Sequence, residues 1–333
     1  MIFVVPESQA QPSGGNLYNR LLLRALRKKG VRAEALTVGP AISRLKRSRV
    51  GSYWVDSLCL DELERFLKLK GEELRIYALV HDLPSLEPGL SLSARGRRAA
   101  REKKLLSRVS GFLVTSRWTE SVLLKYGLAG KPILVVPPAP AVFPSRFRPP
   151  VRGFIGLMVN NLIRRKGILE FLSCLARQLK ESDTFTLLIA GRSDIDPDFS
   201  RRCLNLINRH PRLRTSVEFL GPLRPAGVKR CLENSSVFIS ASRMETFGMA
   251  IQEALAFGLP VLALDAGNVK HLLWPERTGL LFRTMPALAK ACARYIRDPD
   301  ALGTLQRRAR RFVPLDHYDW EDAAQLFLEQ LSG

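Results

Sequence analysis

The sequence predicts an α/β protein made of two doubly wound parallel sheets. Short apolar runs alternate with longer amphipathic stretches along the whole chain, which is the pattern of repeated strand–helix–strand units. The chain has 333 residues, more than one ordinary hydrophobic core holds. Residues 136–150 contain six prolines, which resist helix and central strand and therefore mark a joint between two domains. Because ligands collect at the carboxyl ends of the strands in such sheets, we expect the two domains to face a central cleft.

Each half of the chain supplies its own series of candidate strands. Between the first two of them, residues 16–29 place leucines at helical spacing before a stop at Gly30. Residues 318–331 form an amphipathic stretch that predicts a C-terminal helix. The candidate strands of the first half are residues 2–5, 32–38, 76–80, 111–114 and 133–136, and those of the second half are residues 154–159, 186–190, 217–220, 237–240 and 260–264.

The composition is that of a globular protein. Hydrophobic residues make up 46% and charged residues 25%, so a packed core is expected rather than disorder. No apolar run approaches the ~18 residues that a membrane-spanning helix needs. The first residues lack the basic segment and apolar stretch of a signal peptide, and the five cysteines are scattered without a CxxC pair. We therefore expect a cytoplasmic protein with reduced cysteines, without disulfides or a zinc site.

The charge of the chain is strongly positive and uneven. The formal net charge is +21, and residues 1–150 hold 26 Lys and Arg against 12 Asp and Glu. Basic clusters at residues 44–49 and 95–104 suit an anionic partner such as nucleic acid, an acidic membrane surface or a phosphorylated substrate. A solvated arginine-rich surface is an equal alternative. Nucleic acid is disfavoured as a partner, because the cluster at 95–104 contains no aromatic residue on which a base could stack.

A glutamate pair in the second half lies in a setting that suits a diphosphate. Residues 240–265 read SASRMETFGMAIQEALAFGLPVLALD, which predicts a strand ending at Ser240, a loop around Glu245 and a helix that Gly258 stops. Such a helix start aims backbone N–H groups and its positive end at one spot, where phosphate can bind. Glu253 follows Glu245 by eight residues, about two helical turns, so the two carboxylates can reach different parts of one long ligand. The alternative is a helix start that carries acidic residues for its dipole.

The segment ETFGMAIQE, followed by ALAFGLPVLALDAGN, resembles the Glu-x7-Glu signature of glycosyltransferase family four, the group 1 type of retaining glycosyltransferases. The resemblance implies the GT-B fold, in which two Rossmann-like doubly wound domains face a central cleft. It also implies that Glu245 contacts the transferred sugar and that Glu253 holds the ribose hydroxyls of the nucleotide. The backbone of Phe247, Gly248 and Met249 would bind phosphate.

Two places in the first half match the same family. Residues 12–16 (PSGGN) predict a glycine turn that opens a helix, where Gly14 and Gly15 let the backbone approach a phosphate. An ordinary turn is the alternative. His81 follows the candidate strand 76–80 and resembles the active-site histidine that lies beside the donor sugar in this family. The alternative is a histidine satisfied by local hydrogen bonds.

A third match lies at the start of the second half. Residues 159–167 (VNNLIRRKG) resemble the phosphate-binding segment G-R-L-x-x-x-K-G of the family, and Lys166 matches its phosphate lysine. Asn161 stands where the family has an arginine. The charge of the diphosphate would then be met by Lys166, helped by Arg164 or Arg165.

The resemblance gives each part of the chain a role. Residues 1–148 would be an N-terminal Rossmann-like domain that binds the acceptor, and residues 149–315 a C-terminal Rossmann-like domain that binds the nucleotide-sugar donor. Residues 316–333 would form a C-terminal helix that packs back toward the N-terminal domain. We expect no metal and no cofactor besides the nucleotide sugar, because Lys166, the glycine turn and the helix start can neutralise the leaving diphosphate.

Some polar residues match functional patterns but are also explained by local structure. Asp194-Ile195-Asp196 has the Asp-x-Asp form of metal-dependent glycosyltransferases with a different architecture, but it is followed by Pro197 and is typical of a polar turn. His271 lies where the family often has a glutamate, and either contact with the donor sugar or packing at a helix start would explain it. His210 and His317 lie in polar surroundings and are expected at the surface.

The sequence thus predicts a retaining, metal-independent glycosyltransferase of the hexosyltransferase type that uses a UDP- or GDP-sugar. Its acceptor would be a lipid-linked or cell-envelope glycan, reached when the basic stretch 95–108 contacts an anionic membrane at the inner face of the cell membrane. Two alternatives stay open. One is a catalytically weak GT-B scaffold, motivated by Asn161, and the other is a basic protein that binds nucleic acid or membranes, motivated by the net charge.

Overall fold

The computed structural model describes residues 1–7, 13–48, 50–69, 73–145, 151–313 and 318–332. The chain divides into two compact units, which are called unit 1 and unit 2 below. Unit 1 comprises Met1–Ala139 together with Tyr318–Gly333, and unit 2 comprises Pro140–His317. The division falls within the proline-rich stretch 136–150. None of the helices in the described ranges is both long and apolar enough to cross a bilayer.

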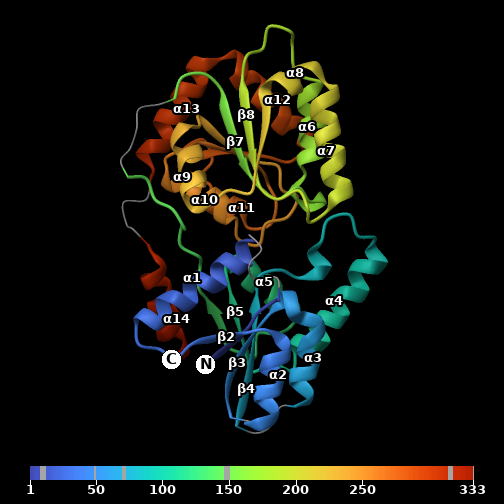
Figure 1. The fold of residues 1–333 in the computed structure, drawn as a ribbon, viewed down its shortest axis with the longest axis vertical. Coiled ribbons are helices and arrows are strands. Elements are labelled where there is room, and N and C mark those ends of the chain that lie inside the picture. The colour runs from blue at the N-terminus through green and yellow to red at the C-terminus, as the bar shows by residue number, and fades with distance from the viewer. Residues whose placement is uncertain (8–12, 49, 70–72, 146–150, 314–317, 333) are drawn as a thin grey trace. The chain divides into compact units, whose positions relative to one another are not determined.

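Unit 1 alternates strands with helices and ends with a helix from the far end of the chain (Figure 1). Its elements are β1 (Ile2–Val4), α1 (Gly14–Lys28), β2 (Glu34–Leu36), α2 (Val38–Arg47), β3 (Gly51–Asp56), η1 (Ser57–Cys59), α3 (Leu60–Lys68), β4 (Leu74–Val80), η2 (Pro84–Leu86), α4 (Leu92–Leu106), β5 (Gly111–Val114), α5 (Arg117–Lys125), β6 (Ile133–Val135) and α14 (Trp320–Ser332).

The strands of unit 1 form one parallel sheet in the order β2-β1-β3-β4-β5-β6. Adjacent residues of each strand point to opposite faces, so two separate cores form. Phe3 and Leu79 pack with α1 and α14, whereas Val4 and Val80 pack with α2, α3, α4 and α5. The strand order reverses direction between β1 and β3, and the helices that follow these strands, α1 and α3, pack on opposite faces of the sheet. In parallel sheets, ligands bind at such a point.

Helix α14 is held to the sheet of unit 1 by an aromatic stack and by one side-chain amide. The ring of Phe327 lies edge-on to Trp54 at 5.1 Å, and Trp54 stacks on Tyr77 at 4.1 Å. Gln330 accepts a hydrogen bond from the N–H of Val135 at 2.8 Å and donates one to its carbonyl at 3.1 Å. The amide thereby satisfies the outer edge of β6, which would otherwise be open to another strand.

Unit 2 repeats the architecture with a different strand order. Its elements are β7 (Ile155–Val159), η3 (Arg164–Lys166), α6 (Ile168–Ala176), β8 (Thr186–Ala190), α7 (Pro197–Arg209), α8 (Pro211–Ser216), β9 (Val217–Gly221), α9 (Pro225–Asn234), β10 (Val237–Ser240), α10 (Met249–Ala256), β11 (Val261–Leu264), α11 (Val269–Leu272), β12 (Gly279–Phe282), α12 (Met285–Arg297) and α13 (Pro299–Arg311).

The parallel sheet of unit 2 has the order β12-β11-β10-β7-β8-β9. One face packs on α6, α7, α12 and α13 and the other on α9, α10 and α11. The order reverses between β7 and β10, so the switch point of this sheet lies at the ends of those two strands.

Two six-stranded parallel sheets with helices on both faces confirm the predicted α/β class (Figure 1). The sequence interpretation missed two strands, β3 and β12. Three of the six residues of β3 are Gly51, Ser52 and Asp56, so its apolar run is too short to recognise in the sequence. In the structure, β3 forms a strand because it pairs with β1 on one side and β4 on the other. The predicted strand 32–38 was too long, because α2 already begins at Val38.

Candidate functional site

The switch point of unit 1 places the start of α1 against His81. Ser13 caps α1 by accepting a hydrogen bond from the N–H of Asn16 at 3.1 Å, so Gly14 and Gly15 are the first two residues of the helix. A Cβ on Gly15 would lie 3.1 Å from Cδ2 of His81, which is tighter than ordinary packing. A side chain at position 15 would therefore require the imidazole or the helix start to shift by a few tenths of an ångström.

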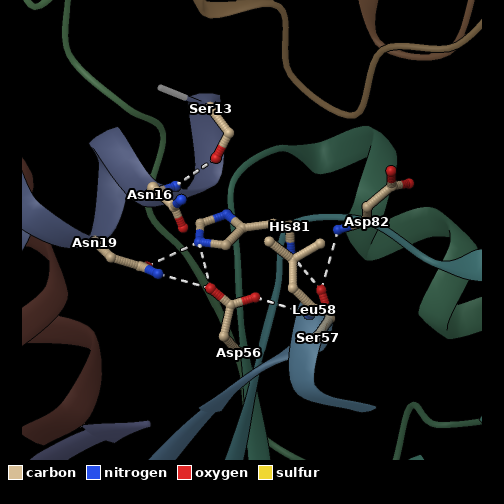
Figure 2. Close-up of polar contacts among 8 residues, drawn as sticks. All are labelled: Ser13, Asn16, Asn19, Asp56, Ser57, Leu58, His81 and Asp82. Carbon is tan, nitrogen blue, oxygen red and sulfur yellow. Dashed lines mark hydrogen bonds and ion pairs between the residues drawn. The ribbon is translucent and has the colours of Figure 1, made fainter. Parts of the chain in front are cut away.

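His81 directly follows β4 and is almost completely buried, at 8% exposure. Its Nε2 lies 2.8 Å from Oδ1 of Asn19 and 3.7 Å from Oδ2 of Asp56. Asn19 in turn donates from Nδ2 to Oδ2 of Asp56 at 2.6 Å. Figure 2 shows these three side chains converging from α1, from the end of β3 and from the end of β4.

The surroundings of His81 favour a neutral imidazole. Burial lowers the pKa of His81 below its usual value, and the carboxylates of Asp56 and Asp82 oppose this only in part. The hydroxyl of Ser57 accepts hydrogen bonds from the backbone N–H groups of His81 and Asp82, at 3.0 and 3.1 Å, and so fixes the backbone that carries the imidazole.

Sequence reasoning found His81 but missed Asn19 and Asp56. Asp56 is the last residue of β3, and that strand was not recognised; a carboxylate at the carboxyl end of a strand would have been the signal. Asn19 is buried at 3% exposure on the apolar face of α1, three residues before Leu22. A polar residue on the buried face of a predicted helix needs a partner, and this pattern could have drawn attention to it.

The switch point of unit 2 brings together the loops after β7 and β10. Lys166, at the end of η3, donates to Oε1 of Glu245 at 2.5 Å, and both side chains are largely buried. The two loops are also joined through their backbones, since the N–H of Arg243 donates to the carbonyl of Arg165 at 2.9 Å. The structure thus places the Lys166 ammonium directly on the Glu245 carboxylate.

This ion pair sets the ionisation of Glu245. Burial alone would raise the pKa of its carboxyl, but the charges of Lys166 and Arg165, with the hydrogen bond from Lys166, outweigh burial and lower the pKa. Glu245 is therefore a carboxylate at neutral pH and is unsuited to act as an acid.

Gly248 shapes the start of α10. Its φ of 101° lies in the left-handed region, so a residue with a side chain would be strained there. Gly248, the N-cap residue of α10, has no side chain to accept a hydrogen bond from the first turn, so the N–H groups from Met249 onward suit an anion. The preceding residue, Phe247, is buried, and its carbonyl accepts a hydrogen bond from Asn268 at 3.0 Å.

Glu253 lies one turn into α10 and is 7% exposed. The N–H of Ala141 contacts its Oε1 at 3.3 Å, and no salt bridge to Glu253 is present within the described ranges. Burial raises the pKa of the Glu253 carboxyl to about 7, against the opposing effect of this hydrogen bond. A buried carboxylate without a cation is suited to accept hydrogen bonds from hydroxyl groups of a ligand.

The arginine position of the phosphate segment is occupied by an asparagine that supports the next loop. Oδ1 of Asn161 accepts a hydrogen bond from the N–H of Arg192 at 3.0 Å, and the N–H of Leu162 donates to the carbonyl of Arg192 at 2.8 Å. The guanidinium of Arg192 pairs with Asp194. Asn161 therefore ties the loop after β7 to the loop after β8.

The other polar candidates have local roles. Asp196 caps α7 through the N–H of Phe199 at 3.1 Å, and Asp194 is held by Arg192. Within the described ranges, no three His, Cys, Asp or Glu side chains gather as a metal ion would require. His271 is exposed on α11, His210 precedes α8, and His317 lies outside the described residues.

Unit 1 also contains a hollow of about 680 Å³ beside η1. It lies at the carboxyl ends of β1 and β2, and Leu58, adjacent to Ser57, is exposed at its edge. Its lining mixes apolar and charged side chains, among them Glu7, Val38, Leu58, Asp61 and Arg65.

The raised pKa of Glu253 predicts a pH-dependent effect of removing its charge. An unfolded glutamate titrates near its ordinary value of 4.5 and the folded one near 7, so folding binds a proton between these values and stability falls as the pH rises through them. Glu253→Gln should therefore raise the free energy of unfolding by about 3 kcal/mol at pH 8 and by little at pH 5. Urea unfolding at both pH values measures this. Glu181→Gln, at an exposed position, serves as the control, and an equal effect of Glu253→Gln at both pH values would refute the assignment.

Comparison with known proteins gives a family for one part of the chain. Residues 149–298 match the model of the family described as glycosyl transferases group 1. A GDP-mannose-dependent alpha-mannosyltransferase of Mycolicibacterium smegmatis is 36% identical over 94 residues, which cover 28% of this chain and 25% of the relative. The chain thus matches about a quarter of the length of that curated relative.

Similarity to solved structures extends over both units. Sucrose-phosphate synthase from Thermosynechococcus elongatus matches with a TM-score of 0.80 and 20% identity, covering 99% of this chain and 98% of that one. HepE from Anabaena, solved in complex with UDP-glucose, matches with a TM-score of 0.75 and 16% identity over 99% and 98%. The chain has the GT-B fold, and its residues 149–298 match the family of group 1 glycosyltransferases.

Proposed function

We propose that the protein is a retaining glycosyltransferase that uses a nucleotide-diphosphate sugar, a UDP- or GDP-sugar, without a metal ion. The observation that carries the proposal is the convergence at the switch point of unit 2. There Lys166 and Glu245 form a buried ion pair immediately before the uncapped start of α10, and Glu253 follows within the helix. A cation, the backbone N–H groups of a helix start and a buried carboxylate suit a diphosphate linked to a ribose.

Each group has a role toward the donor. Lys166, helped by Arg165 and the N–H groups of Phe247, Gly248 and Met249, neutralises the diphosphate. Glu253 accepts hydrogen bonds from the ribose hydroxyls. The Gly14-Gly15 helix start of unit 1 offers further N–H groups to phosphate, and Asn161 shapes the loop that carries Lys166.

The ionised state of Glu245 supports a transfer in which the acceptor attacks the anomeric carbon from the face that the phosphate leaves. The bond between the anomeric carbon and the phosphate oxygen breaks, the acceptor oxygen bonds to that carbon from the same side, and its proton passes to the departing phosphate. Glu245 is held by Lys166 and is ionised, so it suits orientation of the sugar better than attack or proton donation. For His81, at the switch point of unit 1, the proposed role is to orient a sugar hydroxyl.

The names of similar proteins suggest the donors to test first. One is called GDP-mannose-dependent and another was solved with UDP-glucose. The hollow beside η1, which mixes apolar and charged side chains, is a candidate for the acceptor, for which a lipid-linked or envelope glycan is our proposal. The alternative of a catalytically weak scaffold rests on Asn161, which replaces a cation with a neutral side chain.

Slow hydrolysis, with water standing in for the acceptor, tests the reaction. In the presence of EDTA, the protein should release sugar from UDP-glucose or GDP-mannose, and one-dimensional NMR should show the donor's own α-anomer first. Lys166→Ala should lower the rate by at least about tenfold, because a charge-assisted contact to the leaving group is lost. Lys290→Ala, on the exposed side of α12, is the control. First release of the β-anomer, or an absolute need for a divalent metal, would contradict the mechanism, and binding without any release would favour the scaffold.

The basic surface of α4 leads to a separate test of membrane contact. Arg95, Arg97, Arg98, Lys103 and Lys104 are exposed on this helix, and Leu92 at its start is 87% exposed. Vesicles with acidic lipids should retain the protein at low salt and release it at high salt. The double variant Arg95→Glu/Arg97→Glu should lose most of this binding, while Lys290→Glu/Arg308→Glu in unit 2 should keep it. Equal loss in both variants would mean that overall charge, and not α4, is responsible.

A further inference from the structure

The buried polar network of unit 1 contains two residues that the proposed reaction does not use directly. Asp56 is fully buried, and Asn19 is 3% exposed. Asn19 contacts the imidazole of His81 from α1, and Asp56 contacts it from the end of β3 (Figure 2). Burying a carboxylate beside a neutral imidazole is costly, so the arrangement calls for a physical reason.

The carboxylate of Asp56 fixes the orientation of the Asn19 amide. Oδ1 of Asp56 accepts the N–H of Leu58 at 2.8 Å, and Oδ2 accepts Nδ2 of Asn19 at 2.6 Å. A carboxylate only accepts hydrogen bonds, so the NH₂ end of the amide must face it. The carbonyl end of Asn19 is thereby turned toward His81.

The orientation of Asn19 then fixes the proton on His81. Oδ1 of Asn19 lies 2.8 Å from Nε2, and an amide oxygen has no hydrogen to give. Nε2 must therefore be the donor. In a neutral imidazole the other nitrogen, Nδ1, is then an acceptor.

Nδ1 is left for a ligand. Among the described residues, no hydrogen bond to Nδ1 is present, and Figure 2 shows this nitrogen on the ring edge that faces away from Asp56. Gly15 and the edge-to-face ring of Tyr18, 5.1 Å away, hold the imidazole in this position.

We propose that Asp56 and Asn19 are positioning residues that hold His81 as the Nε2–H tautomer and so make its Nδ1 a hydrogen-bond acceptor. Such an atom receives a hydroxyl hydrogen and repels a phosphate oxygen. The assignment of that hydroxyl to the transferred sugar rests on the proposed function, whereas the tautomer itself does not.

A purely structural role for Asp56 makes a different prediction. If the carboxylate only satisfied the N–H of Leu58 and stabilised the fold, removing its charge would destabilise unit 1 without changing the tautomer of His81. Tautomer and stability must therefore be measured separately.

The test is long-range ¹H–¹⁵N correlation spectroscopy of the imidazoles in the full-length, ligand-free protein. The chain has four histidines, and the signals lost in His81→Gln assign those of His81. The wild type should show the Nε2–H pattern at pH 7.5. A wild-type Nδ1–H pattern, or an imidazolium, would overturn the proposal without any variant.

Asp56→Asn tests whether the Asp56 carboxylate sets the tautomer of His81 through the amide of Asn19; this coupling is called the relay below. An amide at 56 can face Asn19 with either end, so the amide of Asn19 can turn and the Nδ1–H tautomer should become clearly populated. Ser57→Ala is the matched control, because it removes a neighbouring hydroxyl that accepts from the backbone N–H groups of His81 and Asp82 and not from the imidazole. It should leave the Nε2–H pattern unchanged. An unchanged pattern in folded Asp56→Asn would overturn the relay.

Asn19→Ala covers the case in which Asp56→Asn does not fold. Loss of the amide leaves Nε2 with the Asp56 carboxylate as its nearest polar group, and the single Nε2–H pattern should give way to an imidazolium or mixed pattern. An unchanged pattern would show that Asn19 does not set the tautomer. Donor hydrolysis separates the two proposals: a correct tautomer without turnover refutes the proposed function, and turnover with the wrong tautomer refutes the relay.

Discussion

The candidate functional residues of both units depend on one topological constraint, the reversal of strand order in a parallel sheet. At β1 and β3 in unit 1, and at β7 and β10 in unit 2, successive loops leave toward opposite faces. Ligands of such sheets bind at the carboxyl ends of these strands. The start of α1 and Asp56 lie at the first switch point, while Lys166 and Glu245 lie at the second. The strand order of each sheet thus fixes the place where a ligand can bind, and the side chains there determine which ligand it is.

Side chains at these points are charged and buried, which is unfavourable for folding alone. Lys166 and Glu245 offset the cost by pairing, and Asp56 offsets it through two N–H donors. Glu253 has one weak hydrogen bond, so its pKa rises to about 7. A ligand whose hydroxyl groups donate hydrogen bonds to Glu253 would stabilise its charged form. Phosphate oxygens of the same ligand would give Lys166 a further negative partner. Such stored electrostatic cost is common at functional sites.

Much of this arrangement could be predicted from the sequence, because the relevant signals are local. The strand–loop–helix pattern around Glu245 needs only neighbouring residues, and the predicted strand 237–240 coincides with β10. The contacts of His81 were not predictable in this way. Asn19, Asp56 and His81 lie 37 and 25 residues apart in the chain, and only the packing of α1 against β3 and β4 joins them. Similarly, the ion pair of Lys166 with Glu245 joins loops that are 79 residues apart.

The function of unit 2 depends on whether its ion pair opens for a diphosphate. Calorimetric titration of the wild type with UDP, GDP and ADP, without divalent metal, tests this most directly. We expect selective binding of one nucleotide, weakened at least about tenfold in Lys166→Ala and in Glu253→Ala but not in Lys290→Ala, which corresponds to about 1.4 kcal/mol or more. If the folded wild type bound none of the three, or if Lys166→Ala bound as tightly as the wild type, the assignment of the donor site would be wrong.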